Sequence, residues 1–173
     1  RTWANLKKLG VISFLEEAKK QGKIRHIGFS FHDASPVFRK IATAYDWDFC
    51  QIMLNYLDTH YQAGITGYNL AVSRGMGVIS MEPLRGGKLV SPIPEAITKI
   101  WQRSTVKQNP QERAMRWVWN LSGCTTLLSG MSSMQQLQEN LAQADVWQDN
   151  NLTEAEIKLY KRVRREYIKR IPI

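Results

Sequence analysis

Cysteine is scarce in this sequence, and its two copies are far apart. Among 173 residues only Cys50 and Cys124 are cysteines, and no CxxC spacing occurs. Two isolated cysteines cannot form a zinc or iron–sulfur site alone. We therefore expect both thiols to lie in the core, and we assign no metal ligand to the chain. Such cysteine usage suits a reducing compartment, so we expect a cytoplasmic protein.

Signals for membranes and secretion are also missing. No segment has about 18 consecutive apolar residues, the length that a membrane-spanning helix needs. The chain opens on Arg1-Thr2-Trp3-Ala4-Asn5, which is not a secretory signal. The composition is 43% hydrophobic and 23% charged, which is ordinary for a globular domain. We treat residues 1–173 as one domain or part of a larger one.

Acidic residues are outnumbered by basic ones. The chain has 24 Lys and Arg against 15 Asp and Glu, which gives a net charge of +9. Such a balance is compatible with nucleic acid, an anionic membrane or a phosphorylated ligand. No motif for nucleic-acid binding is present, so we expect neither nucleic acid nor a membrane as a partner.

The densest basic cluster lies in a helix expected at residues 153–170. Thr153 and Glu156 form a capping box at its start. An apolar stripe along this helix predicts that one side packs on the core, while the basic side is solvated. The stripe is Ile157, Tyr160, Val163 and Tyr167, and the cluster is Lys158, Lys161, Arg162, Arg164, Arg165, Lys169 and Arg170.

Strand-like and helical patterns alternate along the whole chain. Nearly continuous apolar runs at 24–30, 49–54, 77–81 and 125–129 predict four strands that are buried on both faces. Helical patterns at 35–45, 66–74 and 95–101, and from residues 110 and 134, separate and follow them. The alternation predicts an α/β fold with parallel βαβ units. Four such units make half of a (β/α)8 TIM barrel or a small doubly wound sheet.

The positions of the glycine-rich loops separate these two folds. A doubly wound sheet would place a GxGxxG loop after its first strand, but Ser30-Phe31-His32-Asp33 stands there. The last strand instead ends in Ser129-Gly130-Met131-Ser132-Ser133 and leads directly into a helix from Met134. Free N–H groups at a helix start, with serine hydroxyls beside them, favour an anion. A phosphate site after the last strands is typical of a (β/α)8 barrel.

Four segments, in order, resemble the aldo-keto reductase superfamily. The resemblance covers essentially the whole chain and corresponds to strands five to eight, the C-terminal half of that barrel. The amino-acid sequence of these segments is most similar to the bacterial and archaeal subgroup that carries an iron–sulfur segment after the barrel. The matching segments are Gly22–Ser30, Asp46–Gln51 with Asn55-Tyr56, Ile79–Leu89, and Ser129–Ser132 with Leu137, Glu139 and Asn140.

The resemblance implies an NADP(H)-dependent oxidoreductase that reduces aldehydes or ketones by hydride transfer. It implies that Ser30 and Gln51 bind the nicotinamide amide, with Met81 packed on the ring. The pyrophosphate would lie along Leu84, Arg85, Gly86 and Lys88. The adenosine end would meet Gly130, Met131, Ser132, Gln136 and Asn140. Because Met131 and Gln136 are uncharged, the choice between NADP and NAD stays open, and one of Ser132 and Ser133 fits a simple N-cap.

The resemblance also implies what this chain does not supply. The family's proton-donating Tyr and its Asp, Lys and His neighbours come from the first four strands, so we assign no catalytic residue here. We expect the chain alone to be inactive and to be a fragment whose partner is the missing N-terminal half. A 4Fe-4S cluster of the parent would bind beyond Ile173. His32 and Tyr56 are the expected contacts of a small carbonyl substrate.

A non-catalytic role stays open on the same fold. A nucleotide-binding regulatory or structural protein would bind the cofactor without turnover. An unrelated phosphate-binding barrel segment is a second alternative. No Ser-His-Asp set, paired carboxylates or metal constellation in the sequence points to another chemistry.

Overall fold

The chain folds around a parallel sheet of four strands. A computed structural model describes residues 2–147 and 151–170. The strands are β1 (Gly28–Ser30), β2 (Phe49–Met53), β3 (Gly77–Met81) and β4 (Cys124–Leu127). They lie side by side in chain order, and each adjacent pair is parallel. The prediction of four parallel strands in order is therefore confirmed.

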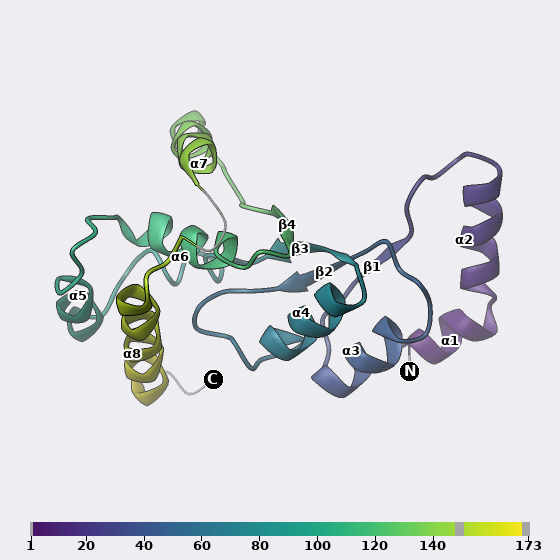
Figure 1. The fold of residues 1–173 in the computed structure, drawn as a ribbon, viewed down its shortest axis with the longest axis horizontal. Helices are drawn as coiled ribbons and strands as arrows, with labels where there is room; N and C mark the ends of the chain where they lie inside the picture. The colour runs from purple at the N-terminus through teal and green to yellow at the C-terminus, as the bar shows by residue number, and fades with distance from the viewer. Residues whose placement is uncertain (1, 148–150, 171–173) are drawn as a thin grey trace.

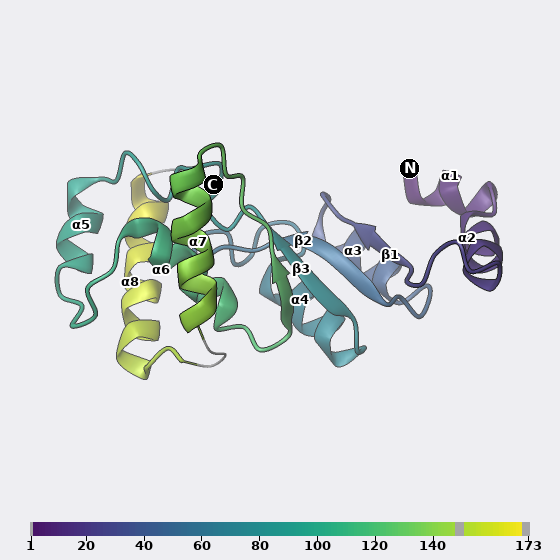
Figure 2. The same ribbon diagram turned by 90° about the horizontal axis from the view of Figure 1, so that it is seen from above.

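Helices connect the strands and lie on both sides of the sheet (Figure 1). α3 and α4 cover one face, while α7 lies on the other side (Figures 1 and 2). α5, α6 and α8 gather at one end, and α1 and α2 at the other (Figure 1). The helices are α1 (Thr2–Lys8), α2 (Val11–Lys20), α3 (Ser35–Ala42), α4 (Gly64–Ser73), α5 (Glu95–Trp101), α6 (Pro110–Trp119), α7 (Met134–Val146) and α8 (Glu154–Arg170).

Two apolar clusters hold these layers together. The first joins the sheet to α3 and α4, with Phe38, Ile52 and Val78 at its centre. The second lies beyond the ends of the strands and joins α5, α6 and α8 around Tyr56 and Tyr160. The stripe predicted for the last helix is largely confirmed, because Tyr160, Val163 and Tyr167 are buried; Ile157, at 36% exposure, is not.

Most predicted helix starts are found, and one is shifted. The Asn109 side chain accepts from the Glu112 N–H at 2.8 Å, and the Glu112 carboxylate accepts from the Asn109 N–H at 2.9 Å. The Ser35-Pro36 pair in the sequence favours Ser35 as the cap of α3, but Ala34 is the N-cap. The Asp33 carboxylate accepts the Ala34 N–H at 2.7 Å, just before the helix. α3 also ends at Ala42, short of the predicted residue 45.

The first strand is shorter than predicted, because it pairs with its neighbour over three residues only. β1 pairs with β2 only over Gly28–Ser30, and β2 begins at Phe49. Just before these pairs, the Asp48 carboxylate accepts the Ile27 N–H at 2.7 Å, and the Asp48 N–H donates to the Ile27 carbonyl at 2.8 Å. Lys19 also donates to this carboxylate at 3.1 Å. Asp48 therefore closes the amino-terminal end of the sheet.

These contacts make Asp48 a source of pH-dependent stability. The Ile27 N–H, followed by Lys19, lowers the pKa of the Asp48 carboxyl. A lowered folded pKa stabilises the protein above the unfolded pKa of about 3.9, and this stabilisation is lost as the pH falls through the folded pKa. We expect Asp48→Asn to lower the melting temperature at pH 7 and to have less effect as the pH falls below about 4. Melting curves of both proteins from pH 7 to pH 2.5 test this; equal differences at every pH would contradict it.

A buried ion pair attaches α8 to α6. The Arg116 guanidinium donates to the Glu156 carboxylate at 2.8 Å, and the two side chains are 9% and 11% exposed. Burial alone would raise the pKa of Glu156, but the Thr153 N–H and hydroxyl, together with Arg116, lower it. The Thr153 hydroxyl in turn accepts the Glu156 N–H at 3.2 Å, so the predicted capping box is confirmed.

Among the described helices, none is long and apolar enough to cross a membrane.

Candidate functional site

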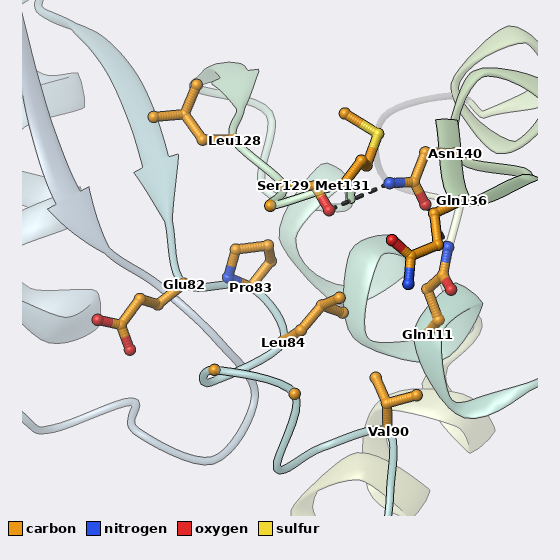
Figure 3. Close-up of a pocket in the computed structure, with 13 residues that line it drawn as sticks. Glu82, Pro83, Leu84, Val90, Gln111, Leu128, Ser129, Met131, Gln136 and Asn140 are labelled. Carbon is orange, nitrogen blue, oxygen red and sulfur yellow. Dashed lines mark hydrogen bonds between the residues drawn. The ribbon is translucent and has the colours of Figure 1, made fainter. Parts of the chain in front are cut away.

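A pocket of about 560 Å3 lies between the loop that leaves β3 and the turn that leaves β4. We call it the exit-loop pocket (Figure 3). Because both loops follow the carboxyl ends of adjacent parallel strands, the pocket lies where α/β folds bind their ligands. Its lining residues are Glu82, Pro83, Leu84, Gly86, Gly87, Val90, Gln111, Leu128, Ser129, Gly130, Met131, Gln136 and Asn140.

The loop after β3 has a tightly constrained backbone. Glu82, Arg85, Gly86 and Gly87 all have positive φ, at 54°, 51°, 60° and 85°. Side chains other than glycine are uncommon in this region, so the surroundings must hold Glu82 and Arg85 there. A Cβ added at Gly86 or Gly87 would meet no heavy atom within 4 Å. Backbone conformation therefore favours glycine at both positions, and the open space lets a ligand approach the main chain.

Arg85 does not line the exit-loop pocket, and its side chain instead holds the loop after β3 in place. Its Nε donates to the Asp58 carboxylate at 2.8 Å, and Asp58 is only 3% exposed. The Asn55 amide donates to the same carboxylate oxygen at 3.2 Å and to the Glu82 carbonyl at 3.3 Å. A buried carboxylate needs a cationic partner, so Arg85 positions two exit loops relative to each other. Its expected pyrophosphate contact stays a prediction.

The turn after β4 forms the bend expected between the last strand and its helix. Ser133 is the N-cap of α7, and its hydroxyl accepts the Gln136 N–H at 3.2 Å. The Gln136 side-chain oxygen returns to accept the Ser132 N–H at 2.9 Å and the Ser132 hydroxyl at 3.3 Å. Of the two serines left open by the sequence, Ser133 is the cap. Ser132 is held by Gln136, whose side chain would have to turn away before Ser132 could meet an anion.

Asn140 joins three elements at the back of the pocket. Its amide nitrogen donates to the Ser129 hydroxyl at 3.1 Å (Figure 3), and its oxygen accepts from the Gln111 amide. Asn140 is 8% exposed. The sequence did not point to Gln111, although its place directly after the Asn109-Pro110 helix start marks it as a residue of a helix N-terminus. Gln111, Gln136 and Asn140 give the pocket a set of neutral amides.

Charge is nearly absent from the lining of the exit-loop pocket. Glu82 is its one ionisable lining residue among those described. Its carboxylate points away from the other labelled side chains (Figure 3). Lys88 is exposed on the same loop but is not part of the lining. The lining therefore offers neutral amides, backbone groups and apolar side chains.

The sequence profile of the aldo/keto reductase family matches residues 4–164. The chain belongs to the aldo/keto reductase family. No curated protein sequence matches it at a significant level. Solved structures do match, with identities below 25% that show the fold alone.

The matching structures agree over most of this chain. A holo aldo-keto reductase from Bacillus halodurans has a TM-score of 0.69 at 20% identity, with 86% of this chain and 53% of that chain covered. An aldo-keto reductase from Klebsiella pneumoniae in complex with NADPH has a TM-score of 0.65 at 17% identity, with 88% of this chain and 52% of that chain covered. The glycerol dehydrogenase of Gluconobacter oxydans has a TM-score of 0.62 at 16% identity, with 92% of this chain and 54% of that chain covered. The chain spans about half the length of these relatives, and its four-stranded parallel sheet fits part of a (β/α)8 barrel.

Three of the residues that the resemblance selects lie along the sheet itself. Ser30 and Gln51 are directly paired in the register of β1 and β2. The Gln51 amide lies 3.5 Å from the Met81 sulfur on β3. Ser30 and Met81 are the last residues of their strands, and Gln51 lies in the middle of β2. None of the three lines the exit-loop pocket. Six of the residues selected do line it: Leu84, Gly86, Gly130, Met131, Gln136 and Asn140.

The two expected substrate contacts lie in different places. His32 is exposed directly after β1 and, with Ser30, borders a hollow of about 410 Å3 beside α1 and α2. Tyr56 is 2% exposed and packs against Trp101, Tyr160 and Tyr167 in the second apolar cluster. Burial is the main cause that raises its pKa well above the ordinary value. Tyr56 is therefore a core residue here, and we do not retain it as a substrate contact.

The cysteines differ in burial. Cys50 is fully buried, and burial raises the pKa of its thiol to about 12. Cys124 is half-buried at the start of β4, so the expectation of a core thiol holds fully only for Cys50. In residues 2–147 and 151–170, no group of three or more His, Cys, Asp and Glu could hold a metal ion. The iron–sulfur segment suggested for the parent lies outside the described residues.

Proposed function

We propose that this chain is the cofactor-binding half of an NADP(H)-dependent oxidoreductase that reduces a small aldehyde or ketone. The observation that carries the proposal is the exit-loop pocket. Two loops chosen for their sequence resemblance, after β3 and after β4, meet there and contribute four of the residues selected, and α7 contributes two more. The coverage of about half of each related structure supports the view that the chain corresponds to strands five to eight. The same proposal includes membership of the iron–sulfur subgroup, and that part rests on the similarity of the amino-acid sequence alone.

The pocket has features that fit a dinucleotide. A Cβ at Gly86, Gly87 or Gly130 would meet nothing within 4 Å, so phosphate oxygens can approach the main chain there. The volume of about 560 Å3 is in the range of cofactor pockets. We assign the adenosine end to Met131, Gln136 and Asn140. The amides of Gln136 and Asn140 match the polar edges of a base and a ribose, and Met131 offers an apolar surface.

The remaining proposed contacts follow the sheet edge toward β1. Ser30 and Gln51 would hold the nicotinamide amide, because paired hydroxyl and amide side chains can bind both its donor and its acceptor. Met81 lies beside Gln51 and offers a polarizable surface to a ring. Lys88 is the proposed cation for the pyrophosphate, and Arg85 positions the loop through Asp58. When bound, the nicotinamide supplies the hydride.

A charge placed in the turn after β4 should weaken cofactor binding. We expect Ser132→Asp to raise the dissociation constant of NADPH about ten- to a hundredfold, because a carboxylate beside a phosphate is repelled and a hydrogen bond is lost. Turnover at saturating NADPH should change far less. Calorimetric titration of the intact protein with NADPH and NADH measures both affinities and settles the preference between the two cofactors.

A matched substitution separates site from charge. Gln135→Glu adds the same charge on the next turn. Neither Ser132 nor Gln135 lines the pocket, but Ser132 bonds to the lining residue Gln136, whereas Gln135 bonds to Glu139. Weaker NADPH binding in Ser132→Asp, but not in Gln135→Glu, would support a phosphate at the turn. Equal binding by Ser132→Asp and the wild type would mean that the phosphate lies elsewhere.

Oxidation of NADPH by small aldehydes and ketones distinguishes the enzyme from the regulatory alternative. The intact protein should consume NADPH in proportion to carbonyl added, followed at 340 nm. Tight NADPH binding without turnover on any carbonyl tested would favour a nucleotide-binding regulator. Absence of NADPH binding would reject both.

A further inference from the structure

A second hollow, of about 610 Å3, lies between α8 and the loop that leaves β2. We call it the basic groove. None of its lining residues lines the exit-loop pocket, although α6 contributes a residue to each. The lining residues are Tyr56, Thr59, His60, Ile65, Trp117, Ile157, Lys158, Tyr160, Lys161, Arg164 and Arg165.

One wall of the basic groove is a row of cations on α8. Lys158, Lys161 and Arg165 lie three and four residues apart, so they share one side of the helix over about 10 Å. Arg164 adds a fourth cation, and its Nε donates to the Leu57 carbonyl at 2.9 Å. No Asp or Glu stands among the described lining residues.

Most of this charge is not neutralised by the protein itself. Lys158 has a loose pair with Glu154 at 3.7 Å, and both side chains are largely exposed. Within the described part of the chain, no carboxylate forms an ion pair with Lys161 or Arg165. Like charges three or four residues apart on a helix repel one another. An anion bound between them would relieve that repulsion.

The floor of the groove is apolar and comes from three helices. Trp117 of α6 is half-buried there, Ile65 of α4 lies half-buried beside it, and Ile157 of α8 is 36% exposed. The cationic wall of α8 therefore lies beside a surface suited to a ring or an alkyl chain. A simple solvated helix face would not need an indole and two isoleucines between its cations.

We propose that the basic groove binds a small organic anion, with a phosphate held by Lys161 and Arg165 and an aromatic or alkyl body on Trp117 and Ile157. The volume of about 610 Å3 suits a small molecule. A cation row of about two helical turns is short for a nucleic acid or a long acidic peptide. The site is separate from the proposed cofactor site, so it would hold a second ligand.

Calorimetric titration with 1-naphthyl phosphate tests this proposal. The intact protein is titrated with NADPH present at saturation, so that the exit-loop pocket is occupied, and again without NADPH. We expect one site per chain in both titrations. Inorganic phosphate and 1-naphthol, which each lack one half of the probe, should bind at least about tenfold more weakly.

Charge reversal locates the site. Lys161→Glu/Arg165→Glu should weaken 1-naphthyl phosphate about tenfold or more. Arg162→Glu/Lys169→Glu changes the net charge equally on exposed positions of the same helix outside the lining, and it should bind like the wild type. Circular dichroism melts show whether each variant is folded, and Trp117→Phe, which keeps an aromatic floor, provides a second measurement if a reversal is unstable.

The outcomes are distinct. Weaker binding of 1-naphthyl phosphate in Lys161→Glu/Arg165→Glu, but not in the control variant, supports the proposed site in the basic groove, whether or not NADPH binds. Equal affinity in all variants, or equal weakening by both double variants, would overturn the proposal. If a poly-glutamate peptide binds at Lys161 and Arg165 while 1-naphthyl phosphate does not, the groove docks an acidic protein segment and the proposal is wrong.

Discussion

Gly130→Leu is expected to raise the dissociation constant of NADPH about a hundredfold, equal to about 2.7 kcal/mol of binding free energy. Gly130 lines the exit-loop pocket, and a Cβ there would meet no heavy atom within 4 Å, so a side chain can be added at this position at the expense of the pocket's open space. The backbone of Gly130 is not in the left-handed region. We therefore expect the free energy of unfolding to change by no more than about 0.5 kcal/mol.

The control for this substitution is Gln138→Leu. Gln138 is exposed on α7 but does not line the exit-loop pocket. Fluorescence titration with NADPH and urea unfolding should show binding and stability close to the wild type for this control. Unchanged NADPH affinity in a folded Gly130→Leu protein would show that the cofactor does not occupy this pocket.

Arg116→Met is expected to reduce the free energy of unfolding by about 3–5 kcal/mol. The loss follows because Glu156 would remain as a buried carboxylate without its cation. Arg116 also donates to the Gln108 side chain at 2.8 Å and lies 4.8 Å from the centre of the Trp147 ring. Since these contacts attach α8 to α6, urea unfolding should show the loss directly.

The double variant Arg116→Met/Glu156→Leu completes the cycle. Removing both charges leaves no uncompensated ion, so it should recover most of the stability, less about 1 kcal/mol for the lost capping box with Thr153. A double variant as unstable as the sum of the two single variants would show that the pair is not coupled.

The arrangement of the strands was predictable from local patterns. Each strand is a short apolar run followed by a helix start, and such alternation has few compatible topologies. The exact start of β1 was not predictable, because it depends on the bond between the Asp48 carboxylate and the Ile27 N–H. That contact joins residues from two different segments, and no local pattern reports it.

The candidate site was predictable only where the backbone carries the role. Gly86 and Gly130 stand in breaker-rich loops, and both line the exit-loop pocket. The positions of Arg85 and Tyr56 in the structure were not predictable, because their surroundings come from distant segments. Asp58 pairs with Arg85, and aromatic residues of α5 and α8 enclose Tyr56.

The basic groove illustrates the same limit. The cations of α8 and their apolar stripe were visible in the sequence, and the solvated face was a sound expectation. What turns this face into a candidate site is the floor formed by Trp117 and Ile65 from other helices. Sequence periodicity describes one helix at a time and cannot show which elements lie opposite it.

Hydrogen–deuterium exchange of the intact protein with and without NADPH tests the central claim most directly. We predict slower exchange on binding in two separate segments, residues 84–90 and residues 129–136, because the cofactor would contact the backbone of both loops. The exposed ends of α1 and α2 should exchange equally in both states. Saturating NADPH that protects neither loop would contradict the assignment of the exit-loop pocket as the cofactor site.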